Sequence, residues 1–83
     1  MQDNPLLRLR HAIKPTPKNR AARHWRDRDK NHLLQRELAE LIHCSVWSVR
    51  ECEREKRFPK NEAVRINAVQ LYQKHFPEEK TQA

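Results

Sequence analysis

Glycine is absent from all 83 residues of this chain, and its absence excludes several kinds of site. Walker loops, dinucleotide fingerprints and the nucleophile elbow of hydrolases each need glycine where a Cβ would clash. Only two cysteines are present, Cys44 and Cys52, too few for a disulfide framework. The apolar runs are only a few residues long, so no segment is predicted to span a membrane.

The chain is rich in charged residues, and they are unevenly distributed along it. Hydrophobic residues make up 36% and charged residues 35%, which predicts one small domain with a limited core. The net charge is +7, and residues 1–31 alone carry nine basic and three acidic groups. A basic half beside a nearly neutral half favours a polyanionic partner, most often nucleic acid. Residues 1–5 lack the pattern of a secretory signal, so we expect a cytoplasmic, nucleoid-associated protein with reduced thiols.

The first seventeen residues predict a short helix over 5–13 that is followed by a break. Asn4 can cap this helix, and Pro5 suits its first position. Three apolar residues share one face: Leu6, Leu9 and Ile13. The prolines at 15 and 17 end the helix. We interpret residues 1–17 as a basic N-terminal arm, which either follows DNA or packs its apolar face on the domain or across a dimer.

We expect residues 18–76 to form the helix-containing domain and residues 77–83 to form a polar C-terminal tail. Helices are expected over about 20–31, 34–42, 46–55 and 62–76, with N-caps at Asn19, Ser45 and Asn61. Trp25 is predicted to anchor the first of them on the core. Solvent-facing positions on these helices are Arg20, Arg23, Arg26, Arg28, Arg36, Glu37 and Glu40. No segment alternates as a strand, so the predicted fold is all-α, with about five helices and a basic N-terminal arm.

Residues 35–54 have the spacing of a helix-turn-helix motif, in which the second helix enters the major groove of DNA. The crossing of the two helices needs a small residue at the fifth position, where Ala39 stands. The fourth, eighth, tenth, fifteenth and eighteenth positions must be apolar, and they are Leu38, Ile42, Cys44, Val49 and Cys52. The pattern thus predicts a recognition helix over 46–55.

Over about residues 33–72 the chain resembles the phage-repressor/Cro-type regulators, also called xenobiotic-response-element-type regulators. Residues 35–41 resemble the family's first motif helix, and 45–53 its recognition helix. Glu-Arg-Glu-Lys-Arg-Phe-Pro at 53–59 resembles the family's Glu-Arg-Gly-Lys-Arg-x-Pro stretch. The resemblance implies a sequence-specific transcriptional regulator of a bacterial mobile element or phage, most simply a repressor, that binds operator DNA as a homodimer.

Two positions depart from the family's pattern. His43 and Glu55 stand where glycine is usual, and these positions can favour a positive φ. Either the helix over 46–55 runs on through Lys56, or the following loop is reshaped. The departure keeps open a winged-helix, excisionase-like protein that bends DNA, with strand structure at 58–66.

Because Val49 and Cys52 point inward, the opposite face of the 46–55 helix is predicted to read bases. The candidate base contacts are Val46, Trp47, Arg50 and Glu51. Arg50 can fork onto guanine, and Glu51 can accept from cytosine. Alternatively Trp47 is a core or dimer contact, and Glu51 simply pairs with a neighbouring arginine.

Phosphate contacts are predicted around this helix and along the arm. The candidates near the motif are Gln35, Ser45, Ser48, Arg54, Lys56 and Arg57. The candidates on the arm are Arg8, Arg10, Lys14, Lys18 and Arg20. The resemblance implies a structural role for Glu53, which we expect to pair with an arginine such as Arg28 or Arg36.

Other chemistry is weakly represented. His32, His43, Cys44 and Cys52 lie close in sequence, but the C-x₂₋₄-C spacing of zinc sites is absent. The inward phase of both cysteines argues against a catalytic thiolate. We therefore expect no enzyme activity, cofactor, metal, membrane association or small-molecule ligand. An antitoxin-type module that binds protein through the 62–76 helix is the alternative from another class; in either case that helix is the expected dimer surface.

Overall fold

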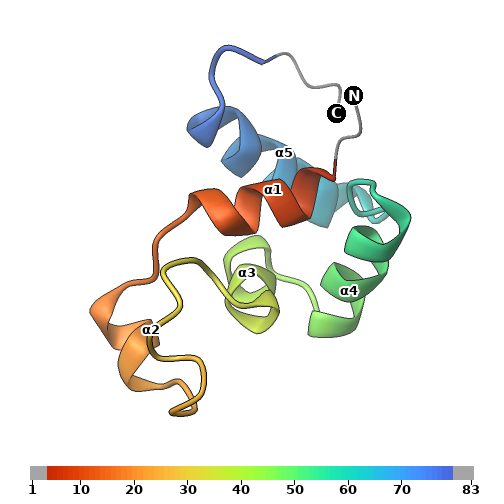
Figure 1. Ribbon diagram of the computed structural model, residues 1–83. Helices are drawn as coiled ribbons and strands as arrows, with labels where there is room; N and C mark the ends of the chain where they lie inside the picture. The colour runs from red at the N-terminus through yellow and green to blue at the C-terminus, as the bar shows by residue number, and fades with distance from the viewer. Residues whose placement is uncertain (1–3, 80–83) are drawn as a thin grey trace.

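The computed structural model describes residues 4–79, which form five helices and no strand (Figure 1). The helices are α1 Pro5–Ala12, α2 Pro17–Ala21, α3 Gln35–Ile42, α4 Val46–Glu55 and α5 Glu62–His75. The all-α prediction with about five helices is confirmed. Residues 1–3 and 80–83, the outer ends of the predicted arm and tail, lie outside the described residues. No helix within 4–79 has the length and apolar composition needed to cross a bilayer.

The core lies where α1 crosses between α5 and the α3–α4 pair (Figure 1). Its fully or nearly fully buried side chains are Leu6, Leu9, Leu33, Leu38, Ala39, Ile42, Val49, Cys52, Ala68 and Tyr72. Every position predicted to face inward from the 35–54 motif is in this set, except Cys44, which is half-buried and packs against it. The apolar spacing of the motif therefore sets how α3 and α4 pack.

The N-terminal segment belongs to the core. Pro5 occupies the first turn of α1, where its missing N–H has no partner to lose. Leu6 and Leu9 are completely buried, and Ile13 packs against the same cluster. Of the two alternatives for residues 1–17, the structure thus places the apolar face on the domain itself.

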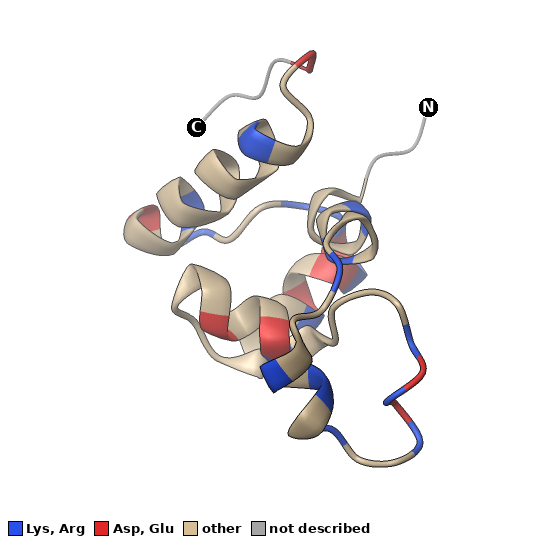
Figure 2. Cartoon of the chain, turned by 90° about the vertical axis from the view of Figure 1, so that its left-hand side faces the viewer, with Lys and Arg blue, Asp and Glu red and all other residues tan. Residues whose placement is uncertain are grey.

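The helix predicted over 20–31 is wrong. α2 ends at Ala21, and it is capped by Thr16, whose hydroxyl accepts from the Asn19 amide at 3.1 Å. Residues 22–34 form a loop, hereafter the 22–34 loop, which protrudes from the domain with basic and acidic residues in alternation (Figure 2). Trp25 is 69% exposed and does not anchor anything on the core.

Both helices of the motif end in a left-handed residue. His43 has φ 63° and Lys56 has φ 58°. Glu55 keeps a helical conformation, so the position with positive φ falls one residue later than the family pattern places it. Non-glycine residues reach this region at some cost, which the bonds from the Cys44 amide to Ala39 and from the Arg57 amide to Cys52 help to offset.

α5 begins after the predicted cap, because the Asn61 side chain accepts from the Val64 amide at 3.1 Å. Glu62 is its first residue, and no strand occurs at 58–66. The structure of this region is therefore not a wing. At the other end of α5, the Tyr72 hydroxyl accepts from Arg8 at 2.7 Å and donates to Glu79 at 2.9 Å.

The buried position of α1 predicts a large loss of stability on truncating its core leucine. Leu9→Ala is expected to lower the free energy of unfolding by about 2–5 kcal/mol, because it removes apolar contacts and leaves a cavity. Leu7→Ala, on the same helix at a half-buried side chain outside the core cluster, is the matched control and should cost much less. Urea denaturation measures both, and equal losses would contradict the placement of α1 in the core.

The imidazole rings of His11 and His32 stack at 4.3 Å, which joins α1 to the 22–34 loop. Burial lowers the pKa of His11, and the neighbouring His32 and Arg10 lower it further. The unfolded chain therefore takes up a proton at His11 at higher pH than the folded chain does. Stability should fall as the pH drops through about 6.5, the ordinary histidine value, toward the folded pKa.

Chemical denaturation at neutral and mildly acidic pH tests this dependence. His11→Gln is expected to lose less unfolding free energy on acidification than the wild type. His75→Gln, at an exposed histidine of α5, should keep the wild-type dependence. An unchanged acid sensitivity in His11→Gln would show that the stacked pair does not control it.

Candidate nucleic-acid interface

The turn between α3 and α4 fixes the direction of the second helix. His43 reverses the chain in the left-handed conformation, and the Cys44 amide donates to the Ala39 carbonyl at 2.9 Å. Ser45 then caps α4, with its hydroxyl accepting from the Ser48 amide at 3.2 Å. The predicted N-cap is confirmed, and the Ser45 and Ser48 hydroxyls lie together at the exposed start of α4.

The outward face of α4 is exposed and carries one large aromatic side chain. Trp47 is 71% exposed, and the Arg50 guanidinium lies 5.2 Å from the centre of its ring, a cation–π contact. A shallow open hollow of about 340 Å³ lies on this face, lined by Trp47, Ser48, Arg50, Glu51 and Arg54. Val46 is half-buried at the start of the helix. The structure thus brings the four predicted base contacts onto one end of one helix, and Trp47 is not a core residue.

Gln35 connects the first turn of α3 to α4. Its side-chain amide donates to Glu53 at 3.0 Å, and its carbonyl oxygen accepts from Arg50 Nε at 3.2 Å. Arg50 is therefore held by Gln35 on one side and by the Trp47 ring on the other. The hydrogen bond to Gln35 uses Nε and Arg50 is exposed, so its two Nη nitrogens are available for further hydrogen bonds.

Glu53 joins three helices and pairs with an arginine as expected, but that arginine is Arg10 and neither Arg28 nor Arg36. Arg10 donates through Nε at 2.8 Å and through Nη2 at 3.1 Å, a bidentate pair with both side chains largely buried. Asn4 also donates to the Glu53 main-chain carbonyl at 2.8 Å. α1 thereby sets the angle at which α4 leaves the turn.

Charges at the end of α4 are mutually compensated. Glu51 lies 3.4 Å from Arg57 and 3.8 Å from Arg54, as one alternative for that residue anticipated. Arg57 also pairs with Glu55, and this hydrogen bond raises the pKa of Arg57 and lowers that of Glu55. α4 itself holds two arginines against three glutamates, a net charge of −1. Lys56 is exposed just beyond it.

The five basic residues assigned to the arm are spread over different surroundings. Arg8 stacks on Phe76 at 4.3 Å and pairs with Glu79 at 2.6 Å, while Arg10 is held by Glu53. Arg20 donates to the Arg28 carbonyl and to the Asn31 side chain. Lys14 and Lys18 are exposed, and so is Arg8 despite its contacts. The structure therefore does not gather these residues into one strip.

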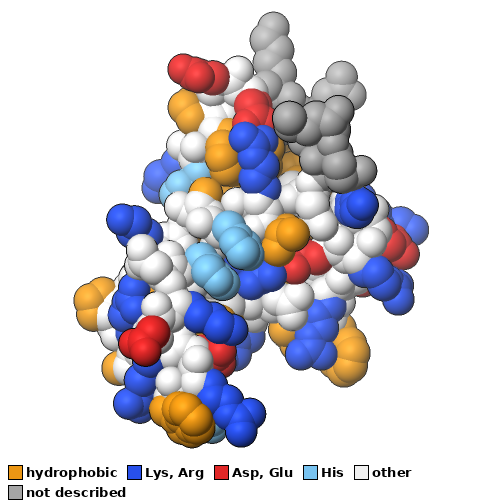
Figure 3. Space-filling view, viewed as in Figure 1, with side chains coloured by type: hydrophobic (Ala, Val, Ile, Leu, Met, Phe, Trp, Pro, Cys, Tyr) orange, Lys and Arg blue, Asp and Glu red, His pale blue; other side chains and the backbone are white. Residues whose placement is uncertain are grey.

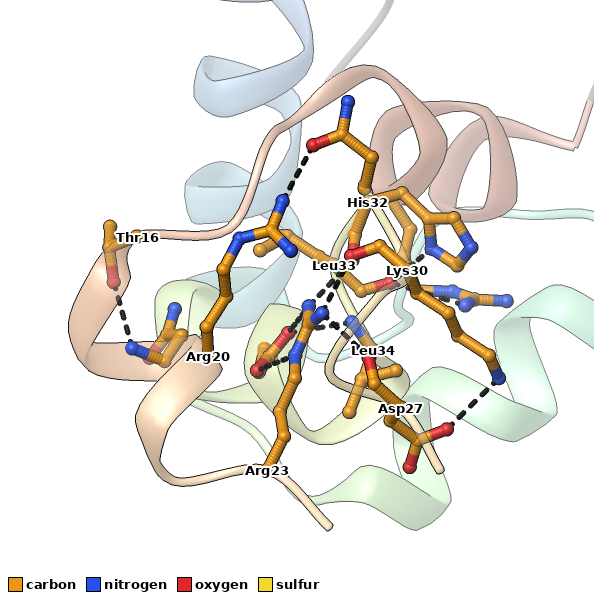
Figure 4. Close-up of polar contacts among 12 residues, drawn as sticks. Thr16, Arg20, Arg23, Asp27, Lys30, His32, Leu33 and Leu34 are labelled. Carbon is orange, nitrogen blue, oxygen red and sulfur yellow. Dashed lines mark hydrogen bonds and ion pairs between the residues drawn. The ribbon is translucent and has the colours of Figure 1, made fainter. Parts of the chain in front are cut away.

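Arg23 and Glu37 form a buried ion pair that the helical pattern did not indicate. Both were expected to face solvent, yet their side chains are 0% and 1% exposed and 2.7 Å apart. Arg23 also donates to the carbonyls of Asp27, Lys30 and His32, which the 22–34 loop wraps around it (Figure 4). The hydrogen bond from Arg23 lowers the pKa of Glu37, so the carboxylate stays ionised although it is buried.

Glu37 also accepts from the Leu34 amide at 2.8 Å, as an acid at the third helical position often does. That position was the one sequence signal that could have revealed the burial of Glu37. Nothing comparable marks Arg23. Two residues along, Trp25 lies at the surface, where its ring is 5.5 Å from that of His24.

The two thiols are part of the packing between α3, α4 and the core. Burial raises the pKa of Cys44 and of Cys52, so both remain protonated near neutral pH. Cys52 accepts a long contact from Arg57 at 3.6 Å.

Comparison of this chain with protein-family models, curated proteins and solved structures finds no match.

Breaking the buried ion pair should strongly destabilise the domain. Arg23→Met leaves Glu37 and three loop carbonyls without their donor, and it is expected to cost about 3–5 kcal/mol of unfolding free energy. Adding Glu37→Met removes the uncompensated carboxylate and should restore part of the loss. Urea denaturation of the single and double variants gives the coupling energy. Additive losses would contradict a direct interaction.

Proposed function

We propose that this protein is a sequence-specific DNA-binding transcriptional regulator that inserts α4 into the major groove. The observation that carries the proposal is the division of α4 into two faces. Val49 and Cys52 are buried against the core, while Trp47 and Arg50 project from the opposite face with no cover. A helix needs such a rigid mounting if its side chains are to meet base edges reproducibly.

Arg50 is the proposed base reader. Its guanidinium can donate two parallel hydrogen bonds to guanine O6 and N7, and a contact of this kind contributes about 1–3 kcal/mol of discrimination. Contacts with Gln35 and Trp47 restrict the Arg50 side chain in the free protein, which lowers the conformational entropy lost on binding DNA. Val46 and Trp47 supply apolar surface for a thymine methyl or a sugar, and Glu51 an acceptor for cytosine.

Phosphate contacts then position the helix on the duplex. Ser45 and Ser48 offer hydroxyls at the α4 N-terminus, whose free amides also favour an anion. Gln35 contacts Arg50 and Glu53 of the same helix, and Arg54, Lys56 and Arg57 lie at its far end. These contacts carry no sequence information, so they set affinity and its dependence on salt.

The active unit is proposed to be a cytoplasmic homodimer on paired half-sites. Besides the two tryptophans, the large apolar side chains exposed on residues 4–79 are Leu41 on α3 and Ile66 on α5, at 48% and 40%, and we assign them to self-association. The same two residues would serve an antitoxin-type protein that binds a different partner. Sedimentation of the purified chain at several concentrations separates the two, because only the first gives a dimer without a partner.

Substitutions of Arg50 and of Lys56 are expected to impair different properties of DNA binding, the first sequence discrimination and the second overall affinity. A preferred site is first selected from random duplexes, and affinities are then measured by fluorescence anisotropy at two salt concentrations. The wild type should prefer a site with guanine at the position that Arg50 contacts over a site with another base there. Arg50→Ala should reduce this preference by about ten- to a hundredfold. Lys56→Ala should weaken all sequences alike and lower the salt slope by about 1.

Arg50→Lys is the matched control for charge. It keeps the cation but loses the planar fork, so non-specific affinity should persist while discrimination falls. Full discrimination in both Arg50 variants would overturn the base-reading role, and a wild type that prefers no sequence would overturn the proposed function.

A further inference from the structure

The 22–34 loop is exposed, yet it is held in place by buried contacts. Arg23 ties it internally through the carbonyls of Asp27, Lys30 and His32, and Glu37 ties Arg23 to α3. Arg20 adds a bond from α2 to the Arg28 carbonyl at 2.8 Å. The side chains at the tip of the loop are therefore presented on an ordered backbone.

The tip of this loop carries the second exposed tryptophan of the chain. Trp25 is 69% exposed, close to the value of Trp47, and the Arg26 guanidinium lies 5.6 Å from the centre of its ring. The Trp47–Arg50 pair on α4 has the same composition and nearly the same separation, 5.2 Å. The described residues thus present two exposed tryptophan–arginine pairs, and tryptophan and arginine are the side chains most enriched where proteins bind their partners.

The charge of the chain favours a nucleic acid as that partner. α4 has a net charge of −1, so it contributes little attraction for a polyanion by itself. Residues 13–31 hold seven basic and two acidic residues, a net charge of +5. Arg23 is neutralised by Glu37 and Lys30 pairs with Asp27, but Arg26 and Arg28 remain exposed. The positive charge that attracts DNA therefore lies mainly in residues 13–31, whereas the proposed base contacts lie on α4.

The two segments reach the same edge of the molecule. In Figures 1 and 3, the 22–34 loop and the start of α4 both lie along the lower edge, each with hydrophobic atoms beside basic ones. An open groove of about 460 Å³ separates them, and its lining includes Lys30 from the loop, Arg36 from α3 and Arg50 from α4. The domain measures 36 × 26 × 22 Å, whereas the major groove is about 12 Å wide. With α4 in the groove, the neighbouring parts of this edge must lie over the phosphate strands.

We propose that the 22–34 loop is a second DNA-contacting element that binds the phosphate backbone flanking the groove entered by α4. Arg26 and Arg28 contact phosphates, and Trp25 packs on the adjacent sugar. This inference rests on the proposed function and adds a separate footprint to it. The loop contributes affinity that is independent of sequence, and α4 contributes discrimination.

Anisotropy titrations of the intact chain at several salt concentrations test the loop directly. The double variant Arg26→Ala/Arg28→Ala should weaken binding to all duplexes at least tenfold and reduce the salt slope by about 2, one for each lost contact. Trp25→Ala should weaken binding without changing the slope. Discrimination between a selected site and its mismatched versions should be preserved in both. Lys74→Ala removes one exposed cation from the last turn of α5 and is the control that should leave the slope unchanged. In Figure 1 the end of α5 lies on the side of the molecule opposite the 22–34 loop.

Hydroxyl-radical footprinting locates the contact. The wild type should protect backbone positions on one side of the α4 site, and the double variant should lose that flank alone. If the wild type binds and Arg50→Ala relaxes discrimination, but the loop variants keep the full affinity, slope and footprint, the inference fails while the proposed function stands. A wild type that binds no duplex, or loop variants that lose binding to a protein partner only, overturns it as well.

Discussion

The ion pair between Arg23 and Glu37 is the interaction on which the arrangement of the α1–α3 connection depends. A buried guanidinium is tolerable only if nearly all its donors are satisfied, and here a carboxylate and three loop carbonyls satisfy them. The loop carbonyls thereby receive the hydrogen bonds that a helix would have supplied. Glu37 also accepts from the Leu34 amide at the start of α3. The same carboxylate therefore fixes both the 22–34 loop and the first turn of α3.

The sequence predicted most of the helical frame because its signals are local. Ser45 and Asn61 mark the starts of α4 and α5, and the spacing of Leu38, Val49 and Cys52 sets the phase of the motif. The phase in turn identified the exposed face of α4, so its outward residues could be named in advance. Their contact with DNA stays a prediction.

The errors share one cause, which is that long-range polar contacts leave no periodic pattern. Arg23 looks like a solvent-facing residue, and its partner lies fourteen positions away. Arg10 and Glu53 are separated by forty-three positions, so nearer arginines looked equally suitable. The segment from 20 to 31 has too few apolar residues to hold a helix on the core, and Trp25 was given an anchoring role that a buried arginine performs.

The two faces of α4 have a consequence for how such a domain can diversify. Val49 and Cys52 are buried in the core cluster, whereas Trp47 and Glu51 are exposed and are not part of it. Substitutions on the exposed face can therefore accumulate without disturbing the fold. The preference for a nucleotide sequence then depends only on exposed side chains. It can change between related proteins while the buried core stays the same.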